Sequence, residues 1–322
     1  ALYSNTTGNS NAALGSGSLG ANSTGDRNSA FGFYSLGNSN GSSNTANGYQ
    51  SLYWNTNGYS NVAVGANALH KNTINHNMVA LGDSALFNNG IGAISATEGS
   101  GNTALGSKAL YSNTRGYYNA ANGYQSLYAN TMGTNNTAVG YQSLLSNTLG
   151  SNNTANGYWA LKLNTGNNNT ASGNASLQNN STGSGNTANG FESLLNNTTG
   201  FSNVAIGTHA LRLNTNRSNL VAVGDSALYN NGIGVTLNAQ AKQNTAIGSK
   251  TLFSNTTGNA NTPVGSTALF SNNAGAGNTA LGSEAMYFNV GGYNNTATGA
   301  LSLYLNSGGF NNTANGITAL RN

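Results

Sequence analysis

Small apolar and polar residues form a sequence motif along this chain that recurs, in most repeats, every 17 residues. The motif reads Asn-Thr-Ala-x-Gly, followed by x-x-(Ala/Ser)-Leu-x-x-Asn-Thr-x-Gly. Counted from the first glycine as position 0, position −2 is Ala in every unit except at Pro263, and position +4 is Leu except at Met286. The glycines at position 0 are Gly15, Gly32, Gly48, Gly65, Gly82, Gly106, Gly123, Gly140, Gly157, Gly173, Gly190, Gly207, Gly224, Gly248, Gly265, Gly282, Gly299 and Gly316. A short fixed period over a whole chain is typical of a repeat protein.

The unit fits one coil of a parallel β-solenoid. Seventeen residues are too few for a helical repeat, and Asn, Gly and Thr are poor helix formers. We therefore predict an all-β protein, a single continuous parallel β-solenoid (β-roll) over residues 1–322 with about 18 coils. Each coil is expected to contain two or three short strands separated by Asn and Gly corners. Coils spaced about 4.8 Å apart would form a rod on the order of 85 Å long.

Residues at one coil position are expected to stack on their own copies in the next coil. Leu at +4 is the candidate core residue, and Ala at −2 indicates a close approach. Asn at +7 and −4 is expected at corners, where stacked amides can form hydrogen-bonded ladders. Two units represent these ladder positions: Ala46, Gly48, Leu52 and Asn55 in one, and Ala138, Gly140, Leu144 and Asn147 in the other. Alternation along a strand places −3 and −1 on one face and −2 on the other, and leaves open which face is inside.

A longer repeat is superimposed on the coil. Residues 78–92 match residues 220–234 at an offset of 142 residues, which corresponds to eight coils. Each copy contains a seven-residue insertion, within 90–101 and 232–243. These insertions contain Glu98 and Lys242 as candidate contact residues, because loops on a rigid scaffold are frequent binding sites. Tolerated bulges left by duplication are the alternative.

Aromatic residues gather at positions +1 and +5. The pairs Tyr49 and Tyr53, and Tyr124 and Tyr128, are candidate contact residues. Exposed, they would form an amphipathic stripe suited to sugars or proteins; buried, they would form a seam between subunits.

Composition argues against several classes of function. Only 5% of the residues are charged, and the ten Lys and Arg are scattered singly, whereas nucleic-acid binding needs clustered cations. There is no Cys, and His70, His76 and His209 lack the neighbours of a metal site, so we expect no metal and no cofactor. No apolar run reaches transmembrane length, so we expect no membrane insertion.

The repeat itself argues against catalysis. A chain built from one repeated motif does not provide a unique set of residues for a catalytic centre, so we expect no enzyme. The many Asn-x-Ser/Thr triplets either accept glycans or follow from the consensus itself.

Both chain ends fall within the repeated motif, without an atypical capping unit. We therefore expect a segment of a longer fibre.

Residues 77–82 (Asn-Met-Val-Ala-Leu-Gly) and 202–207 (Ser-Asn-Val-Ala-Ile-Gly) resemble the head repeats of trimeric autotransporter adhesins of the YadA type. The Asn-Thr-Ala-x-Gly arrays are also similar to repeats of bacteriophage tail fibres. The resemblance covers the whole chain through a short motif. It implies a left-handed β-roll that assembles as a homotrimer and is displayed at a surface, where it binds host molecules. The coil here is longer than the family's usual coil, and the aliphatic residue before the glycine is often replaced by Asn.

Taken together, these features favour a non-enzymatic structural and adhesive fibre segment, extracellular or displayed at a cell or virion surface. It would act as a rigid spacer and as a multivalent binding surface. Its expected partners are copies of itself, as a homotrimer or filament, and a host-surface protein or glycan. The alternative is an ice-binding solenoid that uses a regular array of Thr at position −3.

Overall fold

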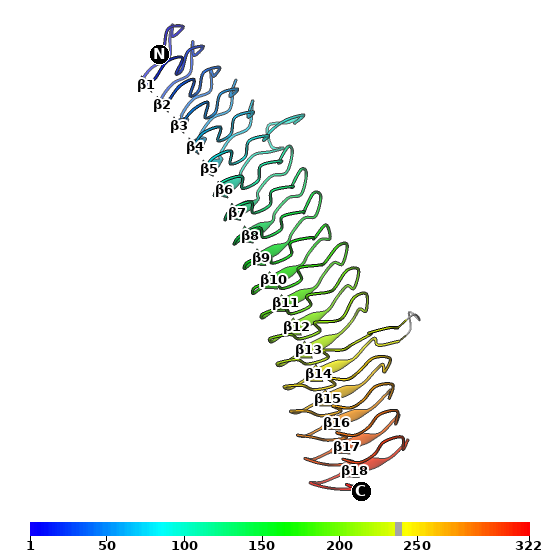
Figure 1. Ribbon diagram of the computed structural model, residues 1–322. Helices are drawn as coiled ribbons and strands as arrows, with labels where there is room; N and C mark the ends of the chain where they lie inside the picture. Colours follow the sequence, from blue (N-terminus) through cyan, green and yellow to red (C-terminus); the bar gives the residue numbers. More distant parts are fainter. Residues whose placement is uncertain (236–239) are drawn as a thin grey trace. The chain divides into compact units, whose positions relative to one another are not determined.

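The computed structural model describes residues 1–235 and 240–322. These residues form two compact units, Ala1–Thr165 and Gly166–Asn322. Each unit is a parallel β-solenoid in which every coil contributes one strand of three residues (Figure 1). The strands of the first unit are β1 (Ala12–Leu14), β2 (Ser29–Phe31), β3 (Thr45–Asn47), β4 (Val62–Val64), β5 (Val79–Leu81), β6 (Thr103–Leu105), β7 (Ala120–Asn122), β8 (Thr137–Val139) and β9 (Thr154–Asn156). Those of the second are β10 (Thr170–Ser172), β11 (Thr187–Asn189), β12 (Val204–Ile206), β13 (Val221–Val223), β14 (Thr245–Ile247), β15 (Thr262–Val264), β16 (Thr279–Leu281), β17 (Thr296–Thr298) and β18 (Thr313–Asn315).

Neighbouring strands within each unit pair in parallel, with equal coil positions opposite one another. Ala46 lies opposite Ala63 in the first unit, and Ala188 lies opposite Ala205 in the second. The predicted all-β parallel solenoid is therefore confirmed. The expectation of two or three strands per coil is wrong, because each described coil contains a single strand.

The strand's buried face is the one that carries Ala at position −2. The three residues of β3 are exposed, buried and exposed in turn, and the same alternation recurs in β8, β9 and β17. Ala46 and Leu52 are both completely buried, so the core of a coil is built from one small and one larger aliphatic side chain. Positions −3 and −1 face outward, which answers the question left open by the sequence pattern.

Alternating left-handed residues replace the expected further strands. Gln50 at +2 and Leu52 at +4 have φ values of 50° each, and most coils repeat this pair. The N–H groups of these two residues point to opposite neighbouring coils. Gln50 donates to the carbonyl of Phe33 in the preceding coil, and Leu52 to that of Ala68 in the following one, both at 2.9 Å. The turn is thus hydrogen-bonded between coils without being extended.

The glycine at position 0 is required by both conformation and space. Gly48 has a φ of 139°, a region that side chains rarely adopt. A Cβ atom there would lie 2.5 Å from the carbonyl oxygen of Gly65 in the next coil. The recurring glycine therefore marks a point where successive backbones approach too closely for a side chain.

Two ladders of buried asparagine complete the interior. At +7, Asn147 donates to Oδ1 of Asn130 at 3.1 Å and to the carbonyl of Gly150 at 2.9 Å. At −4, Asn136 donates to Oδ1 of Asn119 at 3.1 Å and also to the carbonyl of Gly150, at 2.8 Å. The four asparagines are nearly or completely buried. Each amide links its own corner to a neighbouring coil, so polar groups in the core have partners in both directions.

Candidate binding surfaces

The outward strand positions form a continuous face without charged side chains in each unit. Position −1 is aliphatic in five successive coils of the second unit: Ile206, Val223, Ile247, Val264 and Leu281. Four of these side chains are exposed, and Val223 is half-buried. Exposed aliphatic side chains on adjacent strands form the kind of contiguous patch that marks an interaction surface.

A row of threonines borders part of this face. Position −3 is Thr in the last five strands of the second unit: Thr245, Thr262, Thr279, Thr296 and Thr313. The row is preceded by Val204 and Val221, so the Thr array is regular over only part of the unit.

Aromatic side chains at +5 form stacked ladders. In the first unit the stack consists of Tyr53, His70, Phe87, Tyr111 and Tyr128, with ring centroids 5.1–5.6 Å apart and planes within 10°. In the second unit it consists of Tyr229, Phe253, Phe270, Tyr287 and Tyr304, with centroids 5.0–5.6 Å apart. Because each interior ring is covered on both faces by its neighbours, only its edge remains for a ligand, and flat stacking of a sugar on the interior rings is blocked.

The tyrosines at +1 belong to separate ladders. Tyr124 stacks at 5.5 Å on Tyr141, whereas Tyr49 stacks at 5.7 Å on Phe33. Tyr49 and Tyr124 are exposed, while Tyr53 and Tyr128 are half-buried members of the +5 ladder. The predicted pairs therefore divide between an outer and an inner row.

His70 takes an aromatic place in the +5 ladder. Its ring lies between Tyr53 and Phe87, and its Nδ1 lies 3.2 Å from the carbonyl oxygen of Gln50, to which it donates as a neutral ring. Burial lowers the pKa of His70, an effect that the Gln50 contact partly offsets and that nearby Lys71 reinforces. Burial therefore favours the uncharged form of this ring.

Among the described residues, one arginine–carboxylate ion pair is present, and it lies in the second unit. Arg212 Nε lies 2.6 Å from Glu192 Oε2, and His209 Nε2 lies 3.4 Å from the same oxygen. The hydrogen bond to Glu192 raises the pKa of Arg212 above its ordinary value. The Arg212 guanidinium also lies over the Tyr229 ring, at 5.8 Å. Sequence reasoning missed this cluster because positions +2 and +5 vary from coil to coil.

The two predicted loop contacts have local roles. Glu98 Oε2 accepts a hydrogen bond of 2.8 Å from the backbone N–H of Ile94, within the first insertion. Lys242 is half-buried, and its carbonyl accepts from the N–H of Ala260 at 3.1 Å. Residues 236–239 of the second predicted insertion lie outside the described residues.

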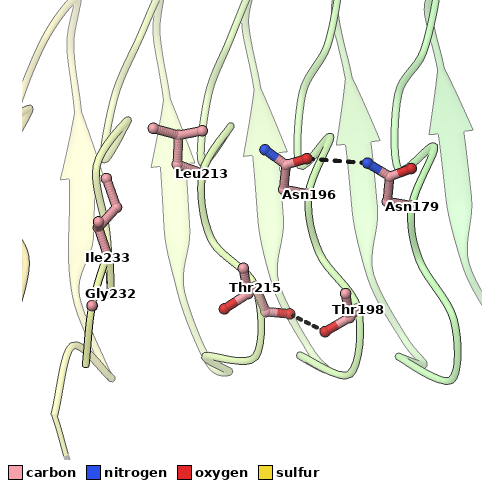
Figure 2. Close-up of a pocket in the computed structure, with 8 residues that line it drawn as sticks. Asn179, Asn196, Thr198, Leu213, Thr215, Gly232 and Ile233 are labelled. Atoms are coloured by element: carbon pink, nitrogen blue, oxygen red, sulfur yellow. Dashed lines mark hydrogen bonds between the residues drawn. The ribbon is translucent and has the colours of Figure 1, made fainter. Parts of the chain in front are cut away.

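A groove of about 560 Å³ lies beside the start of the second insertion. Figure 2 shows its lining: Asn179, Asn196 and Leu213 from position +6, Thr198 and Thr215 from position +8, and residues 232–234. Asn179 Nδ2 donates to Asn196 Oδ1 at 3.0 Å, and Thr198 Oγ1 donates to the carbonyl of Thr215 at 3.0 Å. The groove thus combines amide and hydroxyl groups with the apolar side chains of Leu213 and Ile233.

Across residues 1–235 and 240–322, no three His, Asp or Glu side chains gather as metal ligands would. The same residues contain no helix that is long and apolar enough to cross a membrane. No known protein family matches this chain, and a comparison with curated proteins finds no similar sequence.

Proposed function

We propose that this chain is a non-enzymatic segment of an extracellular or surface-displayed fibre. In this role it is a rigid spacer that assembles with copies of itself and carries a multivalent binding surface. The observation that supports the proposal is the contrast between inside and outside. The buried positions −2, +4 and +7 repeat almost unchanged, while the exposed positions −1 and +1 and the half-buried position +5 vary between coils. Such a division is expected when the interior maintains the scaffold and the exterior makes the contacts.

The strand face is the surface proposed for self-association. Ile206, Ile247 and Leu281 are exposed on it, and no charged residue interrupts positions −3 and −1. Burying such side chains against another copy removes apolar area from water, and no ionic group opposes this association. A homotrimer is the assembly that the resemblance to trimeric adhesins implies.

Variants of the strand face test the proposal. Ile247→Lys places a charge at the centre of the aliphatic row and should dissociate the assembly. Ile94→Lys, in the first insertion, alters a side chain that is 85% exposed and should leave the assembly intact. Light scattering after size-exclusion chromatography measures both masses. An assembly that tolerates Ile247→Lys would contradict the use of this face.

Ice binding is the second candidate function, and the row of five threonines on β14–β18 is the observation that favours it. Regular outward hydroxyl and methyl groups can order water in a repeating array. Thermal hysteresis of the chain, compared with that of a Thr279→Glu variant, tests this function. Activity that Thr279→Glu abolishes would support it, and the absence of hysteresis would exclude it.

A further inference from the structure

Two polar ladders of the second unit end at the groove. At +6, Asn179 donates to Asn196, but the next residue in this row is Leu213, which offers no side-chain acceptor. Figure 2 shows Asn196 Nδ2 directed toward Leu213, and among the described residues it has no hydrogen-bond acceptor. The ladder therefore leaves a free amide donor at the groove.

The hydroxyl row at +8 ends in the same place. Ser181 Oγ and Thr198 Oγ1 each donate to the carbonyl of the following coil, at 2.9 and 3.0 Å. Thr215 is followed by Gly232, where the insertion begins, and its hydroxyl makes only a 3.5 Å contact with Asn216 Oδ1 among the described side chains. A second polar group is thus available beside the Asn196 amide.

The backbone of the groove is not available to a peptide strand. The N–H groups of Asn196, Thr198 and Leu213 already donate to the next coil, at 3.2, 2.6 and 3.1 Å. A ligand must therefore be recognised by side chains rather than by strand addition. The lining contains no charged residue, so a neutral ligand fits best.

We propose that this groove binds a neutral sugar that carries an acetamido group. The acetamido carbonyl would accept from Asn196 Nδ2, its methyl group would lie against Leu213 and Ile233, and a ring hydroxyl would pair with Thr215. The volume of about 560 Å³ is within the range of small-ligand sites. This inference rests on the proposed role of the chain as a binding surface and assigns one ligand class to it.

The first unit provides an internal comparison for this groove, because its equivalent positions carry different residues. Trp54 and Lys71 precede Asn196 and Leu213 by the repeat offset of 142 residues, and the Gly-Ile-Gly at 90–92 matches that at 232–234. Trp54 packs edge-on against Tyr53 at 4.9 Å, and the Lys71 ammonium lies over Phe87 at 5.2 Å. The first unit therefore holds a bulky ring and a cation where the second holds the free amide and its apolar neighbour.

Binding of N,N′-diacetylchitobiose to the full chain, measured by titration calorimetry, tests the inference. Cellobiose is the matched ligand, since it has hydroxyl groups in place of the acetamido groups. The variants Asn196→Trp and Leu213→Lys each introduce the residue found at the equivalent position of the first unit. Asn88→Trp, at +6 of a first-unit coil, is the control. We expect cellobiose to bind at least about tenfold more weakly, both groove variants to lose about tenfold in affinity, and the control to bind normally.

The inference would be overturned by the absence of diacetylchitobiose binding, by equal binding of cellobiose, or by unchanged affinity of both groove variants with normal melting curves. Stronger binding of N-acetyl-dialanine amide would assign the groove to peptides and also overturn it. The assembly mass, measured in the same samples, keeps the two proposals separate. A self-associated chain that ignores the sugar contradicts this inference alone, and a monomer that binds the sugar contradicts the fibre alone.

Discussion

Asn72 donates its side-chain amide to Oδ1 of Asn55, 17 residues earlier, at 2.7 Å, and both side chains are completely buried. The second amide hydrogen of Asn72 serves the carbonyl of Asn75 at 3.1 Å. One side chain thus satisfies a group in the preceding coil and another in its own corner. Repeated along each unit, this relationship makes the interior a hydrogen-bonded amide ladder as well as an aliphatic core.

Removing one amide from the ladder should destabilise the first unit. Asn130→Ala leaves Oδ1 of Asn113 without its amide donor, and one amide hydrogen of Asn147 without its acceptor. Each buried unsatisfied group costs about 1–3 kcal/mol, so for the two groups we expect a loss of roughly 2–6 kcal/mol in the free energy of unfolding. Urea denaturation followed by circular dichroism measures it. Asn122→Ala, at an exposed strand position, is the control and should change stability by less than about 0.5 kcal/mol. Equal effects of the two changes would contradict the ladder's role.

The close approach of backbones at position 0 predicts that alanine substitution destabilises the protein much more at these glycines than at glycines in open positions. In Gly265→Ala the new Cβ would lie 2.4 Å from the carbonyl of Gly282, at a φ of 140°. We expect the free energy of unfolding to fall by about 1–3 kcal/mol from the strained backbone conformation alone, and further from the steric clash. Gly291→Ala meets no atom within 4 Å and serves as the control in the same unit. Thermal melts of the two variants should separate clearly; a Gly265→Ala melt like that of the control would refute the close approach.

The stacked rings should contribute to stability in the interior of their ladder. Tyr111 lies between Phe87 and Tyr128, 5.3 Å from each, and Tyr111→Ala removes both stacking contacts. At about 0.5–1.5 kcal/mol per contact, the loss should reach roughly 1–3 kcal/mol before the lost burial is counted. Tyr111→Phe preserves the ring and should remain near the unmodified chain in urea denaturation. If Tyr111→Ala were as stable as Tyr111→Phe, the ladder would have no energetic role.

His70 predicts a pH dependence of the first unit. Its pKa in the folded chain is lowered from the ordinary 6.5, chiefly by burial, so the unfolded chain binds the proton first as the pH falls. The contribution of this group to stability is therefore complete above pH 6.5 and is lost as the pH falls from 6.5 toward the lower folded value. His70→Phe keeps an aromatic ring in the stack and should flatten the profile. Urea midpoints measured from pH 7.5 to 5 check the slope, and an unchanged slope in His70→Phe would assign it to other groups.

A buried cation in the second unit predicts a stabilising substitution. Arg217 is 1% exposed, and Nη2 donates to the carbonyl of Val235 at 2.9 Å, while Nε and Nη1 have no partner among the described residues. Replacing a poorly paired buried charge with an apolar side chain of similar length is often stabilising, by about 1–4 kcal/mol. Arg217→Met should therefore raise the melting temperature. A lower melting temperature would show that the guanidinium has a stabilising partner.

The coil could be predicted from the repeat because a fixed period places identical residues next to one another in successive coils. Ala46 and Leu52 repeat so regularly that their stacking could be anticipated from sequence. The inward face could not, because alternation alone is symmetric, and only the burial of Ala46 between exposed Thr45 and Asn47 decides it. The single strand per coil was also missed, since nothing in a leucine's identity signals a φ of 50° at Leu52.

The groove beside the second insertion could not be predicted from the sequence, for a different reason. It arises where the Asn row and the Thr row both end, at Leu213 and Gly232, and each change is an unremarkable substitution in the linear sequence. The sequence pattern predicts the seven-residue insertions, and their charged residues Glu98 and Lys242 are the candidate contacts that it offers. Glu98 serves its own loop through the N–H of Ile94, whereas the groove of the second unit is lined by the uncharged residues 232–234.

The mass of the unmodified chain in solution tests the central claim most directly, because a fibre segment with an apolar strand face should not remain single. Sedimentation equilibrium over a wide concentration range measures it. We predict an assembly of three copies of the 32.6 kDa chain, which separates when Ile247 is replaced by Lys. A mass of 32.6 kDa at every concentration would contradict the fibre account.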